Sequence, residues 1–208
     1  MDLSKYNYLK SGRNPWQDPY WYRTEVVLPK SYKGKKVWLI LNGINYRADV
    51  WVNGRQVADK KDIVGMFRRF KLDITGYAHA GANNCIAIKI YQVDHPGVPT
   101  PGTQLKVFGP VRGHSYDIFK DETLKISGGW DCAPVVRDRN MGIYQKVIVE
   151  ATDEVLIENP FVVTTLPKST TMPMKVDTGL AKVNIKLEVR NTSAKLVEGK
   201  VNAWITLI

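Results

Sequence analysis

Short runs of apolar and β-branched residues, separated by turn-forming residues, follow one another along most of the chain. The clearest runs are residues 20–28, 37–41, 48–52 and 86–91. Runs of this length and composition are typical of β-strands, and a continuous apolar run suits a buried strand. No segment keeps a helical period over ten residues, and only residues 74–80 are compatible with a helical turn. The pattern predicts an all-β protein.

A hairpin is indicated at the centre of the first strand group. Asn53 and Gly54 follow residues 48–52, and both residue types accept the positive φ angles of a type I′ turn. Residues 55–58 would form the returning strand. Residues 67–72 alternate between polar and apolar and predict a further strand.

The regular pattern breaks between residues 93 and 136. This stretch holds five prolines and six glycines, with one possible strand at residues 124–127. Long irregular segments inside a compact domain are uncommon and are often functional. We therefore expect any binding residues of the first domain to lie here.

Strand-like sequence returns at residues 143–150 and changes character after residues 151–153. New strands are expected at residues 155–157, 161–165, 183–189 and 201–208. In the last of these, the odd-numbered apolar residues would share one face. We expect two β-sandwich domains, residues 1–152 and residues 153–208, the second of them incomplete.

The charge pattern points away from nucleic acid and membrane partners. Net charge is +10, from 30 basic and 20 acidic residues, but the basic residues are dispersed and accompany no nucleic-acid motif. No apolar run is long enough to span a bilayer. The two cysteines and three histidines have no metal-ligand spacing, and we expect neither a metal site nor a cofactor. The first five residues lack the apolar segment of a signal peptide, so this end does not indicate a compartment.

Tryptophan and tyrosine residues are concentrated in the predicted strands. Aromatic residues that alternate along a strand are more often core than ligand platform, so we expect core positions for this set: Trp16, Tyr20, Trp21, Tyr22, Trp38 and Trp51.

Residues 43–57, with the sequence GINYRADVWVNGRQV, carry a recognisable combination of residues. They precede Gly65, the Asp-Ile-Thr at residues 73–75 and the Gly-Ala-Asn at residues 81–83. This combination resembles the sugar-binding domain of glycoside hydrolase family 2.

A second segment carries a related resemblance. Residues 129–134 read GWDCAP and residues 137–144 read RDRNMGIY. They resemble the Trp-Asp-Trp loop and the following Gly-Ile-Trp strand of β-mannosidases, endo-β-mannosidases and exo-β-glucosaminidases, except that Cys132 and Tyr144 replace two tryptophans.

The resemblance implies an architecture and a partner. A jelly-roll sugar-binding domain would be followed by an immunoglobulin-like sandwich and by a (β/α)₈ barrel of the same polypeptide that carries the two catalytic carboxylates. A barrel needs about 250 residues, so the chain itself would hold no catalytic residue. Its own status as an enzyme stays open, and processing of external glycans favours an extracytoplasmic setting.

The resemblance also implies substrate-binding residues. Trp130 offers an indole face to a pyranose, and Asp131 offers a carboxylate to neighbouring hydroxyls. Asp138 and Asn140 are candidates to join them, with an Arg139–Asp138 pair bracing the loop as the competing interpretation.

Three functions are compatible with these observations. The first is a non-catalytic accessory region that contributes this loop to the substrate pocket of a retaining β-glycosidase. The second is a stand-alone carbohydrate-binding module with its own exposed aromatic platform. The third is a structural spacer in which the loop has lost its role. The sequence does not distinguish the sugar, the linkage or the oligomeric state.

Overall fold

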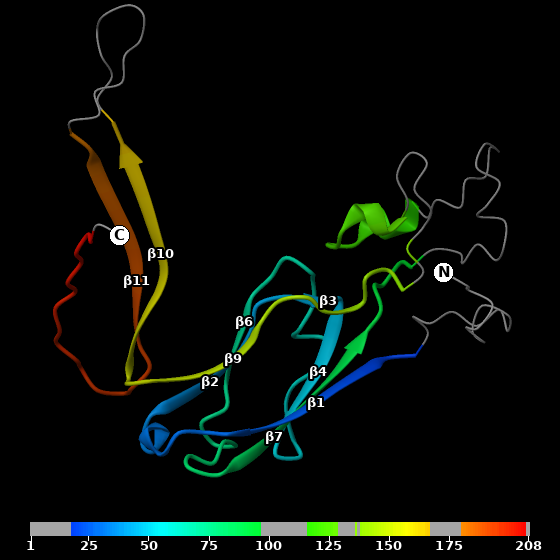
Figure 1. Ribbon diagram of the computed structural model, residues 1–208, viewed down its shortest axis with the longest axis horizontal. Coiled ribbons are helices and arrows are strands. Elements are labelled where there is room, and N and C mark those ends of the chain that lie inside the picture. Colours follow the sequence, from blue (N-terminus) through cyan, green and yellow to red (C-terminus); the bar gives the residue numbers. More distant parts are fainter. Residues whose placement is uncertain (1–17, 97–115, 129–135, 137, 167–179, 207–208) are drawn as a thin grey trace, which may run out of the picture. The chain divides into compact units, whose positions relative to one another are not determined.

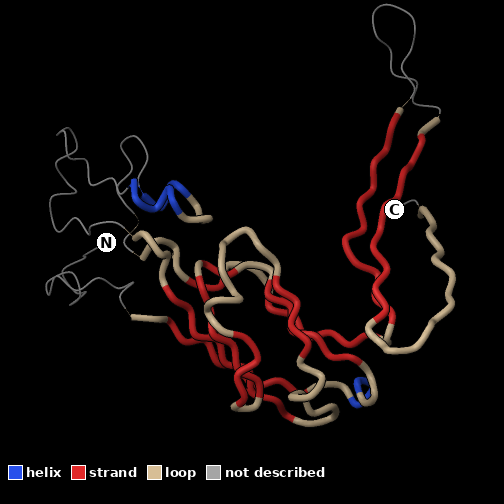
Figure 2. The backbone as a smooth tube through the Cα atoms, turned by 180° about the vertical axis from the view of Figure 1, so that it is seen from behind, coloured by secondary structure: helices blue, strands red, loops and turns tan. Residues whose placement is uncertain are grey.

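The computed structural model describes residues 18–96, 116–128, 136, 138–166 and 180–206. Strands dominate these ranges, and their only helices are 3₁₀ turns of three to five residues. Figures 1 and 2 show this all-β character, which confirms the predicted fold class. Two compact units divide the chain, residues 1–151 and residues 152–208. No described helix is long and apolar enough to cross a membrane.

A four-stranded antiparallel sheet forms one layer of the first unit. Its strands in spatial order are β1 (Tyr20–Val27), β7 (Asn83–Tyr91), β4 (Arg47–Val52) and β5 (Arg55–Ala58). Buried residues alternate along β4 and β7. The period of two in these sequences therefore directs one face of the sheet to the core and the other outward.

The opposing layer is a three-stranded sheet. It contains β6 (Phe70–Asp73), β2 (Lys36–Leu41) and β9 (Val147–Thr152), in that spatial order. Leu39 and Leu41 of β2 join Val50 of β4 and Ile88 and Ile90 of β7 in one buried cluster. The core thus lies between the two sheets, as in a β-sandwich.

The Asn53-Gly54 hairpin forms as the sequence predicts. Asn53 has a φ of 50° and Gly54 a φ of 78°, the positive values of a type I′ turn. Asn53 Nδ2 donates to Tyr77 O at 2.7 Å and to Asn84 Oδ1 at 2.9 Å, and Asn53 Oδ1 accepts from Cys85 N–H at 2.9 Å. This asparagine therefore joins the hairpin to the start of β7.

The Asp-Ile-Thr segment after β6 also has a structural role. Asp73 Oδ1 accepts hydrogen bonds from the Thr75 N–H at 2.9 Å and the Thr75 hydroxyl at 2.5 Å. Thr75 Oγ1 in turn accepts from Val37 N–H at 3.0 Å, which ties the turn to β2. The single turn expected near residues 74–80 begins here, with Ala78 N–H donating to Ile74 O.

The expectation of core positions for the aromatic residues holds only in part. Trp38 is buried, but Trp21 is 59% exposed, Tyr22 is 38% exposed and Trp51 is half-buried. Trp51 points outward because its neighbours Val50 and Val52 are buried. Trp21 lies on the same side of the sheet, opposite the outward position of Lys89 in β7. Trp16 lies outside the described residues.

Two predicted strands are absent from the described structure. Residues 125–128 form a 3₁₀ turn, η6, rather than a strand. Residues 201–206 form no strand, although they alternate. Alternation alone does not make a strand, because a strand also needs a partner for its backbone hydrogen bonds.

The second unit contains one long hairpin in the described residues. β10 (Val155–Thr165) pairs antiparallel with β11 (Lys182–Asn191), with a register shift between Glu158 and Phe161. Exposed apolar side chains line it, including Phe161 at 60% and Val189 at 54%.

Candidate functional site

The described part of the candidate site is built on a buried asparagine. Asn45 lies in the short strand β3 (Ile44–Asn45) and has no exposed surface. Its Nδ2 donates to Arg139 O at 3.0 Å and to Asn140 O at 2.9 Å. Its Oδ1 accepts the hydroxyl of Thr123 at 2.8 Å. One amide therefore joins β3 to two segments far away in the sequence.

Asp138 and Asn140 form the turn that Asn45 holds. Asn140 N–H donates to Asp138 Oδ1 at 2.9 Å, and Met141 N–H donates to Asp138 O at 3.0 Å. Asn140 Nδ2 donates to Ser127 Oγ at 2.5 Å. Asn140 is itself exposed and has a φ of 56°, a value that asparagine tolerates better than most residues. Both predicted residues thus have structural contacts here.

Arg139 between them is almost completely buried. Its Nε donates to Pro96 O at 2.7 Å, and one terminal nitrogen donates to Val136 O at 2.5 Å. Burial lowers the pKa of Arg139 to about 10, and Asp138 opposes this shift. The guanidinium therefore ties residue 96 to the turn through main-chain carbonyls.

A main-chain hydrogen bond joins the residues on either side of the segment that carries Trp130 and Asp131. Val136 N–H donates to Ser127 O at 3.0 Å, so the residues on either side of 128–135 are hydrogen-bonded to each other. Trp130, Asp131 and Cys132 lie outside the described residues. The structure therefore describes how this loop is anchored.

Strand β8 (Gly142–Ile143) continues from the turn and pairs antiparallel with β3. The ring of Tyr144 then packs on Gly43, where a methyl group would lie 2.6 Å from Tyr144 Cζ. The Tyr144 hydroxyl donates to Met66 O. The ring of Tyr144 is accommodated because residue 43 is a glycine and has no side chain.

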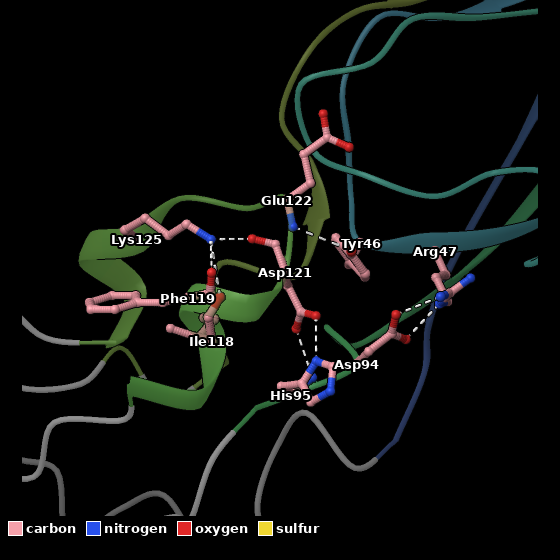
Figure 3. A network of polar contacts seen from close by, with 9 residues as sticks. All are labelled: Tyr46, Arg47, Asp94, His95, Ile118, Phe119, Asp121, Glu122 and Lys125. Atoms are coloured by element: carbon pink, nitrogen blue, oxygen red, sulfur yellow. Dashed lines mark hydrogen bonds and ion pairs between the residues drawn. The ribbon is translucent and has the colours of Figure 1, made fainter.

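A second polar network lies next to this site (Figure 3). The buried carboxylate of Asp121 accepts the His95 backbone N–H at 2.7 Å, and its other oxygen lies 2.6 Å from His95 Nδ1. Lys125 Nζ contacts the carbonyl oxygens of Ile118, Phe119 and Asp121. The 3₁₀ turns η5 (Tyr116–Lys120) and η6 (Lys125–Gly128) are thereby held together.

Arg47 and Asp94 form the edge of the same network. Two guanidinium nitrogens of Arg47 lie 2.6 and 2.5 Å from the two carboxylate oxygens of Asp94, a bidentate pair. Figure 3 shows this pair beside His95, on the strand side of the network. Tyr46 contributes its hydroxyl, which accepts the Glu122 N–H at 3.4 Å, and burial raises the pKa of Tyr46.

The sequence interpretation missed Asn45, Ser127 and Asp121. Asn45 carried a signal, because it is a polar residue between Ile44 and Tyr46 in the short stretch that joins two predicted strands, 37–41 and 48–52. Ser127 and Asp121 carried none, since their partners are distant in the sequence. Within the described ranges, no group of three or more His, Cys, Asp or Glu side chains is placed to hold a metal ion.

Comparison with known proteins identifies a family for most of the first unit. A family model described as glycosyl hydrolase 2 galactose-binding domain-like matches residues 7–145. An exo-β-D-glucosaminidase from Amycolatopsis orientalis is 30% identical over 186 residues, which are 88% of this chain and 14% of that protein. A mannosylglycoprotein endo-β-mannosidase from Lilium longiflorum is 35% identical over 129 residues, 62% of this chain and 12% of that protein.

A solved structure agrees with the sequence relatives. The exo-chitosanase CsxA of Amycolatopsis orientalis matches with a TM-score of 0.55 and 26% identity, covering 90% of this chain and 19% of that one. The chain thus spans less than a fifth of the length of these relatives. Its first unit is a jelly-roll β-sandwich, and the chain belongs to the galactose-binding-like domain family of the family 2 glycosyl hydrolases.

Proposed function

We propose that this chain is the non-catalytic, amino-terminal accessory region of a retaining β-glycosidase. The relatives named above are glycosidases, and this chain covers 14% and 12% of the two curated ones. A (β/α)₈ barrel of the same polypeptide would supply the two carboxyl groups of retaining hydrolysis. The substrate would be a β-linked mannoside or glucosaminide. Residues 153–208 would begin an immunoglobulin-like sandwich between the two.

The contribution of this chain to the pocket would be the loop with Trp130 and Asp131. The observation that carries the proposal is the closed base of this loop, where Val136 N–H donates to Ser127 O at 3.0 Å. Binding residues work best when the surrounding shell fixes their position. Asn45 helps to fix the segment that follows residues 129–135, because its Nδ2 donates to the carbonyl oxygens of Arg139 and Asn140.

Asp138 and Asn140 would act in the same site chiefly as positioning residues. Both make hydrogen bonds within the turn or to Ser127, so their side chains fix the segment after the loop. Trp130 would stack on the sugar ring and Asp131 would accept hydrogen bonds from its hydroxyls.

The test uses the intact polypeptide that carries these residues. Asp131→Ala should lower kcat/KM for an aryl β-mannoside or aryl β-glucosaminide by about tenfold or more, because charge-assisted hydrogen bonds to the sugar are lost. The melting temperature should not change. Asp62→Ala is the matched control, since Asp62 is an exposed carboxylate in the turn between β5 and β6.

Residues 1–208 alone should not hydrolyse either substrate. Turnover by this fragment that an acidic substitution within it abolishes would contradict the accessory role. Unchanged kinetics of Asp131→Ala in the intact polypeptide would instead favour a structural spacer.

A further inference from the structure

The outer face of the four-stranded sheet has features that the proposed function does not use. Outward positions of β4 and β7 and a neighbouring position of β1 form this face, together with Lys60 in the turn after β5. Figure 1 shows how these three strands lie in the sheet. We define the tryptophan face by these residues: Trp21, Asp49, Trp51, Lys60, Lys89 and Tyr91. None of them belongs to the loop with Trp130 and Asp131.

Two tryptophans from strands on either side of β7 meet on this face. The rings of Trp21 and Trp51 are stacked, with centroids 5.2 Å apart and planes at 30°. Trp51 is opposite Ala87 in β7, and Trp21 is opposite Lys89. The short side chain of Ala87 leaves room for the rings to meet across the middle strand. Trp21 remains 59% exposed and so offers indole surface to a ligand.

Two lysines adjoin these rings. Lys89 Nζ lies 5.4 Å from the Trp21 ring centroid and 5.1 Å from that of Tyr91. Lys60 Nζ lies 4.9 Å from the Tyr91 centroid. Neither ammonium is within salt-bridge distance of a carboxylate among the described residues.

Asp49 is the carboxylate that this face itself carries, and it lies opposite Lys89 in the pairing of β4 with β7. Asp49 Oδ2 accepts the Tyr91 hydroxyl at 2.5 Å, and Asp49 Oδ1 accepts the Lys60 N–H at 2.8 Å. Arg47, further along β4, is paired with Asp94. The face thus presents aromatic surface together with two ammonium groups that form no ion pair with a carboxylate of the described residues.

This combination favours a glycan over a protein partner. Charged residues are depleted from the centre of protein interfaces, because an ammonium buried there without a carboxylate loses its hydration. A sugar ring covers an indole with its apolar C–H face and leaves the neighbouring lysines in contact with water. A carboxylate on that ring would complement both lysines.

We propose that the tryptophan face binds an acidic, uronate-containing polysaccharide. The sugar ring stacks on Trp21, and the carboxylate of that sugar pairs with Lys89. Lys60 pairs with the next acidic group along the polysaccharide. None of its residues belongs to the segment with Trp130 and Asp131, so the tryptophan face would retain the enzyme on a polymer without changing hydrolysis of a small substrate.

The experiment is affinity electrophoresis of the intact polypeptide in gels containing polygalacturonate, with glucomannan gels as the neutral comparison. Polygalacturonate should retard the wild type, and Trp21→Ala and Lys89→Gln should each weaken the interaction by about fivefold or more. Trp21→Tyr should restore most of it. Raising the salt to about 0.5 M should reduce binding, because exposed charges are screened.

Two control substitutions separate the site from general attraction to a chain with a net charge of +10. Phe67→Ala removes a 62% exposed aromatic ring outside the face, and Lys33→Gln removes an exposed lysine in a turn. Both should bind as the wild type does. Asp131→Ala should also bind normally, which keeps this proposal distinguishable from the proposed function.

Absence of retardation, equal retardation in glucomannan, or wild-type retardation of Trp21→Ala would each overturn the proposal. Loss of self-association in Trp21→Ala, measured by sedimentation and unaccompanied by any change in polygalacturonate binding, would identify a protein contact instead. Melting temperatures of all variants establish that the fold is intact.

Discussion

At the scale of single residues, asparagine side chains before and after β4 hold the jelly-roll together. Asn45 joins β3 to Thr123 and to the turn at residues 139–140. Asn53 joins the hairpin to Asn84, whose Nδ2 in turn donates to His79 O and Ala82 O at 2.9 Å. An amide can donate and accept simultaneously, so one side chain satisfies several main-chain groups that would otherwise be buried without partners.

Replacing Asn45 tests this reasoning. Asn45→Ala should lower the free energy of unfolding by about 2–4 kcal/mol. Two buried hydrogen bonds and one part-buried hydrogen bond are lost, and the carbonyls of Arg139 and Asn140 lose the donor that Asn45 provides. Chemical denaturation of the intact polypeptide measures the change. Asn42→Ala removes one exposed hydrogen bond, from Asn42 Nδ2 to Lys146 O at 3.0 Å, and should cost less than about 1 kcal/mol. Similar losses for the two variants would contradict the argument.

Gly43 illustrates a close approach that leaves no room for a side chain. A methyl group there would lie 2.6 Å from Tyr144 Cζ and 2.7 Å from Gln145 Cγ. Gly43→Ala should therefore displace the Tyr144 ring and destabilise the protein by about 1–3 kcal/mol. Gly76→Ala is the matched control, because nothing lies within 4 Å of the added methyl. Its effect should stay within about 0.5 kcal/mol, and a comparable loss for Gly76→Ala would disprove the steric explanation.

At the scale of elements, residues that carry the family resemblance form turns and connections between strands. Residues 53–54 close the β4–β5 hairpin, and residues 73–75 connect β6 to β2. β4, which precedes the hairpin, and β7, which follows the second turn, alternate between core and surface. Turn geometry and alternation together therefore fix the register.

The carboxylate of Asp73 makes the stability that this turn contributes depend on pH. Partial burial works to raise the pKa of Asp73, but hydrogen bonds from Thr75 and the nearby Lys36 ammonium outweigh it, and the pKa is below its ordinary value. A lowered pKa means that the stabilisation is present above the unfolded pKa and is lost as pH falls through the folded one.

The loss of free energy of unfolding caused by Asp73→Asn should therefore be larger at pH 7 than below about pH 4. Denaturation midpoints of the two proteins across this range measure it. Asp59→Asn, at another turn carboxylate, provides the comparison for changes in net charge. A loss for Asp73→Asn that did not depend on pH would contradict the assignment.

At the scale of the whole molecule, the two units differ in how completely they bury apolar surface. The first unit encloses a core between two sheets. In the second, the described hairpin exposes Ile157 by 57%, Phe161 by 60% and Val162 by 57%. Two strands alone are marginally stable in water.

We predict that residues 1–152 unfold cooperatively when produced alone and that residues 153–208 do not. The reason is that only the former has a core within its described residues. Thermal unfolding followed by circular dichroism tests both fragments, with the intact polypeptide as reference. A sharp transition for residues 153–208 would show that this segment is a complete domain.

The sequence by itself determined the all-β class, most strands of the sandwich and the Asn53-Gly54 hairpin, because these depend on local alternation and on turn residues with special φ angles. The family relationship was also readable from residues 43–57 and 129–144. The sequence did not place β6, expected at residues 67–72 and found at Phe70–Asp73, because pairing with β2 sets its limits.

Only the tertiary structure decided which side chains meet. It closed the loop base through Ser127, buried Asn45 and Arg139, and turned Trp21 outward to stack on Trp51. These contacts join residues separated by up to about a hundred positions, and their existence depends on strand order and on which face of a sheet each strand buries. Periodicity defines two faces for a strand, whereas packing selects the face that becomes the core.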